Sequence, residues 1–128
     1  MEKLFLVLIV GLGGFIGASL RYIISLNAVN LFGGNFPYGT FIVNVVGAFL
    51  IGLIMELSLD STIISTNAKL FLTTGIMGGL TTFSTFSFET LGMISSGNII
   101  MALVNISLNL FLGIIAVALG QLTARFIF

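Results

Sequence analysis

Long apolar stretches constrain this chain more than any other feature of its sequence. Only 6% of its 128 residues are charged and 58% are hydrophobic, whereas soluble domains carry roughly a quarter charged residues. So few charges cannot cover a surface that faces water. A helix that spans a bilayer needs about 20 apolar residues, and the chain has room for four such helices with short connections. We therefore expect an all-α membrane protein.

The hydrophobic pattern predicts a single domain, residues 1–128, with four membrane-spanning helices. The predicted helices cover about residues 4–26, 38–57, 68–94 and 98–127. Gly33, Gly34 and Pro37 provide the turn before the second span. Residues 57–69 are the most polar part of the chain, so we expect a solvent-exposed connection there.

Lysine and arginine specify the orientation in the membrane only weakly. Lys3, Lys69 and Arg125 fall at one membrane side, and Arg21 approaches the other. Orientation follows the side that is richer in Lys and Arg, and here the bias is only three to one. Such a small bias is compatible with insertion in both directions.

Composition also excludes several classes of function. Cysteine and histidine are both absent, which excludes disulfides, thiol chemistry, soft-metal sites and histidine proton relays. A net charge of zero without a basic run gives no sign of a nucleic-acid partner. The glycines of residues 11–17 fail the dinucleotide-binding spacing, and no nucleophile can be paired with a base. We expect neither an enzyme nor an organic cofactor.

The middle of the third span predicts an interrupted helix. Gly78, Gly79, Thr81 and Thr82 are poor helix formers placed together in mid-membrane, so we expect a break near residues 78–82. A break frees backbone groups that must be satisfied internally or by a bound ion, and broken helices recur at transport sites. The alternative is an intact helix with a glycine-rich packing notch.

Aromatic and hydroxyl residues follow this predicted break. Helical spacing places four residues on one stripe: Phe83, Phe86, Ser87 and Thr90. The edge of a phenyl ring is partly positive. Uncharged donors surround the rings: Ser84, Thr85, Ser87, Asn44 and Asn109. Hydroxyls, amides and ring edges together predict a path for an anion without a fixed positive charge, and weak multiple sites suit rapid conduction.

Two charged residues allow more than one interpretation. Glu89 lies in the polar half of the third span and is either a functional acceptor or, as we favour, a residue near the water interface. Arg21 lies near the predicted end of the first span. It either anchors that end by extending to the interface or raises the local anion concentration at a pore mouth.

Three stretches closely resemble the Fluc (CrcB-type) fluoride channels in order and spacing. They are GGFIGASLR at 13–21, FPYGTFIVNVVG at 36–47 and GGLTTFSTF at 78–86. The resemblance covers essentially the whole chain. Members of that family are antiparallel, dual-topology homodimers of four-helix subunits with two separate fluoride pathways. The resemblance thus implies a multi-pass protein of the cell membrane that exports F⁻ passively down its electrochemical gradient and protects the cell from fluoride toxicity.

The resemblance also implies roles for individual residues. Phe83 and Phe86 look like the aromatic residues of the fluoride pathway, and Asn44 looks like the amide that faces it. Gly78 and Thr81 are similar to the residues whose backbone carbonyls hold a central sodium ion between two subunits. Four more residues would extend the polar path: Thr40, Ser84, Thr85 and Ser87.

The same resemblance assigns Arg21 to a vestibule and leaves part of the fourth span open. Asn105 and Asn109 stand where some members carry Tyr and Ser, so the individual roles of these two asparagines stay open. 

Two other readings remain. A dual-topology multidrug exporter also has four short helices per subunit, but it depends on a membrane-embedded glutamate in the first span, and residues 4–26 contain no acid. A structural subunit of a larger membrane complex would fit the small-residue faces and would leave the cluster of threonine, serine and phenylalanine unexplained.

Overall fold

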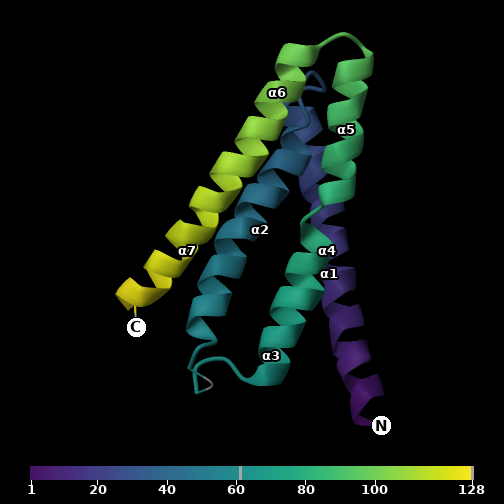
Figure 1. Cartoon of the computed structure of the whole chain (residues 1–128). Helices are drawn as coiled ribbons and strands as arrows, with labels where there is room; N and C mark the ends of the chain where they lie inside the picture. Colours follow the sequence, from purple (N-terminus) through teal and green to yellow (C-terminus); the bar gives the residue numbers. More distant parts are fainter. Residues whose placement is uncertain (61, 128) are drawn as a thin grey trace.

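The computed structural model describes residues 1–60 and 62–127, and these are helical apart from short connections. Residues 61 and 128, in the predicted polar connection and at the end of the predicted domain, lie outside the described residues. The helices are α1 Glu2–Phe32, α2 Tyr38–Leu57, α3 Thr66–Leu70, η1 Phe71–Met77, α4 Gly78–Leu80, α5 Phe83–Ser95, α6 Ile99–Ser107, η2 Leu108–Leu112 and α7 Gly113–Ile127. They form an elongated bundle in which the N-terminus, the α2–α3 connection and the C-terminus lie toward one end (Figure 1).

Helix α1 is longer than the sequence predicted. It continues past residue 26 to Phe32 because the chain offers no helix breaker before Gly33, whose φ of 81° ends the helix. The amide of Gly33 donates a hydrogen bond to the carbonyl of Val29 over 2.9 Å. Arg21 therefore lies well inside a 31-residue helix, further from the end of the helix than the sequence predicted.

The third predicted span is divided into two helical parts. The α3, η1 and α4 segments follow one another without a gap from Thr66 to Leu80, and α5 begins at Phe83. Between them Thr81 and Thr82 are extended, with ψ of 157° and 121°. This interruption lies inside the range 78–82 expected from the sequence. Among the described residues, three helical stretches are continuous and apolar enough to span a membrane: Glu2–Phe32, Tyr38–Leu57 and Ile99–Ile127.

Glycines bring α1 into backbone contact with η1 and α4. A Cβ added to Gly13 would lie 2.8 Å from the Cα of Gly75, and one added to Gly79 would lie 2.9 Å from the amide nitrogen of Ala18. At Gly17 an added Cβ would collide with the carbonyl oxygen of Ile76. Gly13 and Gly17 have GxxxG spacing, and they pack on a second glycine pair four residues apart, Gly75 and Gly79, as small residues do where membrane helices approach closely.

The last span consists of α6, the π-helical η2 and α7. Gly52 of α2 and Gly120 of α7 let these helices cross closely, because an added Cβ would meet the backbone of Val117 or Phe49. The sequence analysis did not anticipate the two π-helical turns, η1 and η2, which widen the helix locally.

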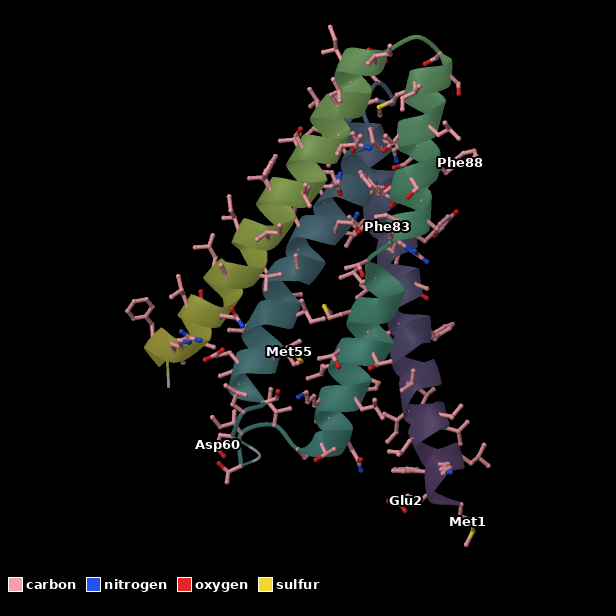
Figure 2. All side chains as sticks on the ribbon, in the orientation of Figure 1. Met1, Glu2, Met55, Asp60, Phe83 and Phe88 are labelled. Carbon is pink, nitrogen blue, oxygen red and sulfur yellow. The ribbon has the colours of Figure 1, made fainter. Side chains whose placement is uncertain are left out.

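The core is small and the outer surface is apolar. Val43, Met77 and Leu80 form the buried cluster between α2 and the η1–α4 segment. Large exposed apolar side chains cover α1, α6 and α7, and side chains project from all helices in Figure 2. A surface of this kind suits a lipid solvent.

Candidate functional site

A groove of about 460 Å³ lies beside the interruption of the third span. Its walls are α2, the segment from η1 to the start of α5, and the η2–α7 part of the last span. The residues predicted as site residues that line it are Asn44, Gly78, Thr81, Phe83, Phe86 and Asn109. The tertiary structure therefore brings together residues from three segments that are distant in the sequence.

Asn44 binds the interruption directly. Its Oδ1 accepts a hydrogen bond from the backbone amide of Thr82 at 2.8 Å, and its Nδ2 donates to the carbonyl of Thr82 at 3.2 Å. In a continuous α-helix the amide of Thr82 would pair with the carbonyl of Gly78, four residues earlier. Asn44 thus takes the place of a helical partner and stabilises the break.

At the break, the backbone carbonyls of Gly78 and Thr81 lose the amide partners that a continuous helix would give them. The Thr82 amide binds Asn44, and the Thr85 amide, which would pair with Thr81 in a continuous helix, donates to the hydroxyl of Thr82 over 3.1 Å. These two carbonyls are the oxygen ligands that the family resemblance assigns to a sodium ion. Carbonyls of unwound helices are suitable ligands for Na⁺, so the donor set fits that ion.

Phe83 and Phe86 lie on the first turn of α5, at the edge of the groove. Their ring centroids are 5.7 Å apart with an interplanar angle of 46°. Phe86 is half-buried, whereas Phe83 is 79% exposed, and Figure 2 shows it at the base of α5. An apolar ring this exposed beside a groove is open to contact with a partner or a ligand.

The hydroxyl residues near the rings are already paired within the chain. Thr82 caps α5, and its hydroxyl lies 3.0 Å from that of Thr85 and 3.4 Å from that of Ser84. The hydroxyl of Ser87 donates to the carbonyl of Phe83 over 2.8 Å. Ser84, Thr85 and Ser87 are all exposed, and Ser87 uses its one donor on its own helix.

Thr40 and Glu89 form a separate polar contact between α2 and α5. The hydroxyl of Thr40 donates to Oε1 of Glu89 over 2.8 Å. The second carboxylate oxygen of Glu89 is buried and has no hydrogen-bond partner among the described residues. The sequence interpretation favoured a site near the water interface for Glu89. The structure shows the side chain half-buried and facing α2, and its place relative to the water interface stays a prediction.

Two residues that the sequence analysis did not assign to the site join it through hydrogen bonds. Asn105 is completely buried, donates to the hydroxyl of Thr90 over 2.9 Å and accepts from Asn109 over 3.0 Å. The sequence contained a signal for this contact, since Asn105 and Asn109 are four residues apart on one helical face. For Thr90 the signal was helical spacing, which places it on the same stripe as Phe83 and Phe86.

Arg21 lies outside the groove. It is half-exposed on α1, and within residues 1–60 and 62–127 no carboxylate forms an ion pair with it. The ion pair that the described residues contain joins Arg125 of α7 to Glu56 of α2, with 2.6 Å between Nε and Oε1.

An interrupted helix that borders a groove of amides, hydroxyls and aromatic rings defines the class: a helical membrane protein with the architecture of transport proteins. Residues 8–121 match the family model described as CrcB-like protein, Camphor Resistance (CrcB). The chain therefore belongs to the CrcB family, and the family resemblance found in the sequence motifs is confirmed.

Relatives that carry the name of a fluoride-specific ion channel match all or nearly all of the chain. It is 64% identical over 128 residues to the fluoride-specific ion channel FluC of Clostridium perfringens (strain ATCC 13124), and each chain is covered completely. The protein of the same name from Clostridium novyi is 57% identical, again over all of both chains. The one from Geotalea daltonii is 46% identical over 121 residues, which cover 94% of this chain and 98% of the relative.

Proposed function

We propose that this chain is the subunit of a fluoride-selective channel that lets F⁻ leave the cell passively and so protects the cell from fluoride. The observation that carries this proposal is the 64% identity, over the full length of both chains, to a protein named as a fluoride-specific ion channel. The chain acts without covalent chemistry. Hydrogen fluoride enters cells as a neutral acid and ionises inside, so a passive leak for the anion is enough to prevent accumulation.

The groove supports conduction of a small anion. It is lined by the amides of Asn44 and Asn109 and by the rings of Phe83 and Phe86, and no lysine or arginine is among its lining residues in the described chain. The N–H groups of both amides are paired within the chain, so the partly positive edges of the two phenyl rings are the uncharged donors that would replace the hydration of F⁻ without holding it tightly, as conduction requires. A narrow path of such donors fits a larger halide poorly, which gives the selectivity over chloride.

Thr40, Ser84, Thr85 and Ser87 extend the polar path in this proposal, and Arg21 forms its vestibule. Ser84 and Thr85 are exposed. The hydroxyl of Ser84 lies 3.4 Å from the capping hydroxyl of Thr82, and that of Thr85 accepts a hydrogen bond from it over 3.0 Å. Arg21 has no ion-pair partner among the described residues, so its charge is available to attract anions.

We further propose that two chains form an antiparallel homodimer in the cell membrane, with two pathways. Support comes from Phe83, which is 79% exposed although it lies beside the groove. A second subunit would cover it and complete the wall of the path. The weak bias of Lys and Arg between the two membrane sides is compatible with insertion in both directions.

Single cysteines test the dual topology, because the native chain contains none. Thr62 and Asn98 lie in connections toward opposite ends of the bundle, and both are exposed. In Thr62→Cys and Asn98→Cys, a membrane-impermeant reagent should label about half of the molecules from outside the cell. Complete labelling of one variant and none of the other would exclude antiparallel insertion.

The backbone carbonyls of Gly78 and Thr81 from both subunits would hold one structural Na⁺ at the centre of this dimer. The redirected donors at the break support this assignment. Replacing all sodium by N-methyl-D-glucamine should lower fluoride flux and weaken the dimer. Flux and dimer content that do not respond to sodium would exclude the ion site.

Efflux from proteoliposomes tests the function itself. Vesicles that contain only this purified chain should release fluoride and retain chloride, as measured with ion-selective electrodes. Release of both halides at similar rates, or of neither, would contradict the proposal.

A further inference from the structure

Five hydrogen bonds connect the pathway residues to the buried Asn105, and all of them donate in the same direction. The donors and acceptors are, in order, Thr82 amide to Asn44 Oδ1 at 2.8 Å, Asn44 Nδ2 to Asn109 Oδ1 at 2.9 Å, Asn109 Nδ2 to Asn105 Oδ1 at 3.0 Å, Asn105 Nδ2 to Thr90 Oγ1 at 2.9 Å, and Thr90 hydroxyl to Phe86 carbonyl at 2.7 Å. We call this series the amide ring.

The amide ring starts and ends on the same element. It leaves the third span at Thr82, the N-cap of α5, passes through α2, η2 and α6, and returns to α5 at Thr90 and Phe86. The segment between these two ends carries the rings of Phe83 and Phe86. The amide ring therefore holds the aromatic segment at both ends against two other helices.

No asparagine side chain in the amide ring can exchange its oxygen and nitrogen by a 180° flip without losing hydrogen bonds. The Nδ2 of Asn44 also donates to the carbonyl of Thr82, and the Nδ2 of Asn109 also donates to the carbonyl of Asn105. A flipped amide would place a donor against a donor. In a low-dielectric interior, hydrogen bonds in series polarise and strengthen one another, and an unpaired member is costly. A single arrangement of the three asparagines is therefore stabilised.

Asn105 itself does not line the groove, and its side chain is completely buried. It can influence a passing ion only through its neighbours in the amide ring: Asn109 and Asn44 on one side, and Thr90 with the groove-lining Phe86 on the other. We propose that Asn105 is a positioning residue of the fluoride pathway: through the amide ring it fixes the interrupted helix and the two phenyl rings in the conducting arrangement. This inference rests on the proposed function.

Thr90 offers the cleanest place to open the ring, because it is buried and lies outside the groove. Thr90→Val removes the hydroxyl at nearly constant shape, whereas Thr90→Ser keeps it. Thr123→Val is the matched control, because the hydroxyl of Thr123 also donates to the carbonyl four residues earlier and belongs to no ring. Asn105→Leu removes the proposed positioning residue.

We expect Thr90→Val and Asn105→Leu to lower fluoride flux about tenfold, as one buried donor or acceptor left without its partner shifts an equilibrium by about that factor. Selectivity for fluoride over chloride should fall as well, because the phenyl rings of Phe83 and Phe86 lose their fixed position. Thr90→Ser and Thr123→Val should conduct like the native chain. The double variant Thr90→Val/Asn105→Leu should conduct fluoride as fast as Asn105→Leu alone, because both substitutions interrupt the same series of hydrogen bonds.

Hydrogen exchange at the amide of Thr82 gives a second measurement that does not depend on transport. Opening the ring at Thr90 or Asn105 should accelerate exchange at Thr82, and Thr123→Val should leave it unchanged. If Asn105→Leu does not assemble, Thr90→Val still decides the question by the same two measurements.

The results separate this inference from the proposed function. Native-like flux, selectivity and Thr82 exchange in Thr90→Val would overturn the positioning role while leaving the channel function intact. Absence of fluoride flux from the native chain would overturn the function, and with it the role of Asn105 in a pathway. Reduced flux with unchanged selectivity in both variants would mean a structural role alone and would also overturn the inference.

Discussion

Two regions of the third span hold their neighbours in opposite ways. Before the interruption, Gly75 and Gly79 contact α1 through bare backbone, and no side chain fits between them. At the interruption, the side-chain amide of Asn44 binds Thr82, and the amide of Asn109 binds that of Asn44. The first region depends on the absence of side-chain volume and the second on the presence of donors and acceptors. Added methyl groups should therefore damage the first region, and isosteric apolar replacements should damage the second.

The largest effect should come from Gly17→Ala in the glycine-packed region. The added Cβ would collide with the Ile76 carbonyl and lie 2.8 Å from the amide nitrogen of Leu80. Overpacking of this kind typically costs about 1–3 kcal/mol, and thermal unfolding in detergent should show it. Gly11→Ala is the control, because a Cβ there has no neighbour within 4 Å. Equal stability of the two variants would refute close packing at this crossing.

The next effect should come from Asn44→Leu in the amide-bound region. The replacement keeps the size and leaves the Thr82 amide without its acceptor at 2.8 Å. Fluoride flux should fall by about tenfold or more, while the helical content in circular dichroism stays the same. Asn67→Leu, at an exposed position of α3, should leave flux unchanged. Native flux in Asn44→Leu would show that this amide has no role in the fluoride pathway.

A smaller effect should follow from Phe83→Ile or Phe86→Ile. Each keeps an apolar side chain but loses the positive ring edge, so flux should fall about fivefold with the dimer still assembled. Phe88→Ile is a matched control, since Phe88 is 79% exposed like Phe83 and lies outside the groove (Figure 2). A loss of flux in Phe88→Ile as large as in the other two would show that exposure alone matters.

The smallest effect should come from Arg125→Gln, which leaves both regions untouched. It removes the ion pair with Glu56, whose arginine side chain is 61% exposed. Exposed ion pairs contribute little and are screened by salt, so the midpoint of thermal unfolding should move by no more than about 2 °C. A much larger shift would mean that the ends of α2 and α7 need this pair to stay together.

The sequence predicted features that depend on neighbouring residues in the chain. Gly78 and Thr82 are poor helix formers wherever they lie, so the interruption could be expected from them alone. The placement of Phe83 and Phe86 on one stripe follows in the same way from helical spacing. The GxxxG spacing of Gly13 and Gly17 is likewise a local feature that indicates close helix packing, but it does not show that Gly75 and Gly79 lie opposite.

The sequence predicted that Asn44 and Asn109 lie near the phenyl rings, but it did not predict which groups of distant segments bond to one another. The contact of Thr40 with Glu89 joins residues 49 positions apart, and that of Asn44 with Asn109 joins residues 65 positions apart. Pattern analysis suggested free donors at Asn44 and Ser87, whereas the structure pairs both with carbonyl oxygens. The fold determines which hydrogen-bond donors already have partners, and the residue types alone do not reveal it.

Helix α1 has a consequence for the lipid that surrounds the protein. At 1.5 Å per residue its 31 residues extend for about 46 Å, well beyond a hydrocarbon core of about 30 Å. The helix must lean away from the bilayer normal or reach into both headgroup layers. Because its glycines join it rigidly to η1 and α4, any tilt of α1 is passed to the broken span, and membrane thickness becomes a determinant of the geometry at Thr81 and Thr82.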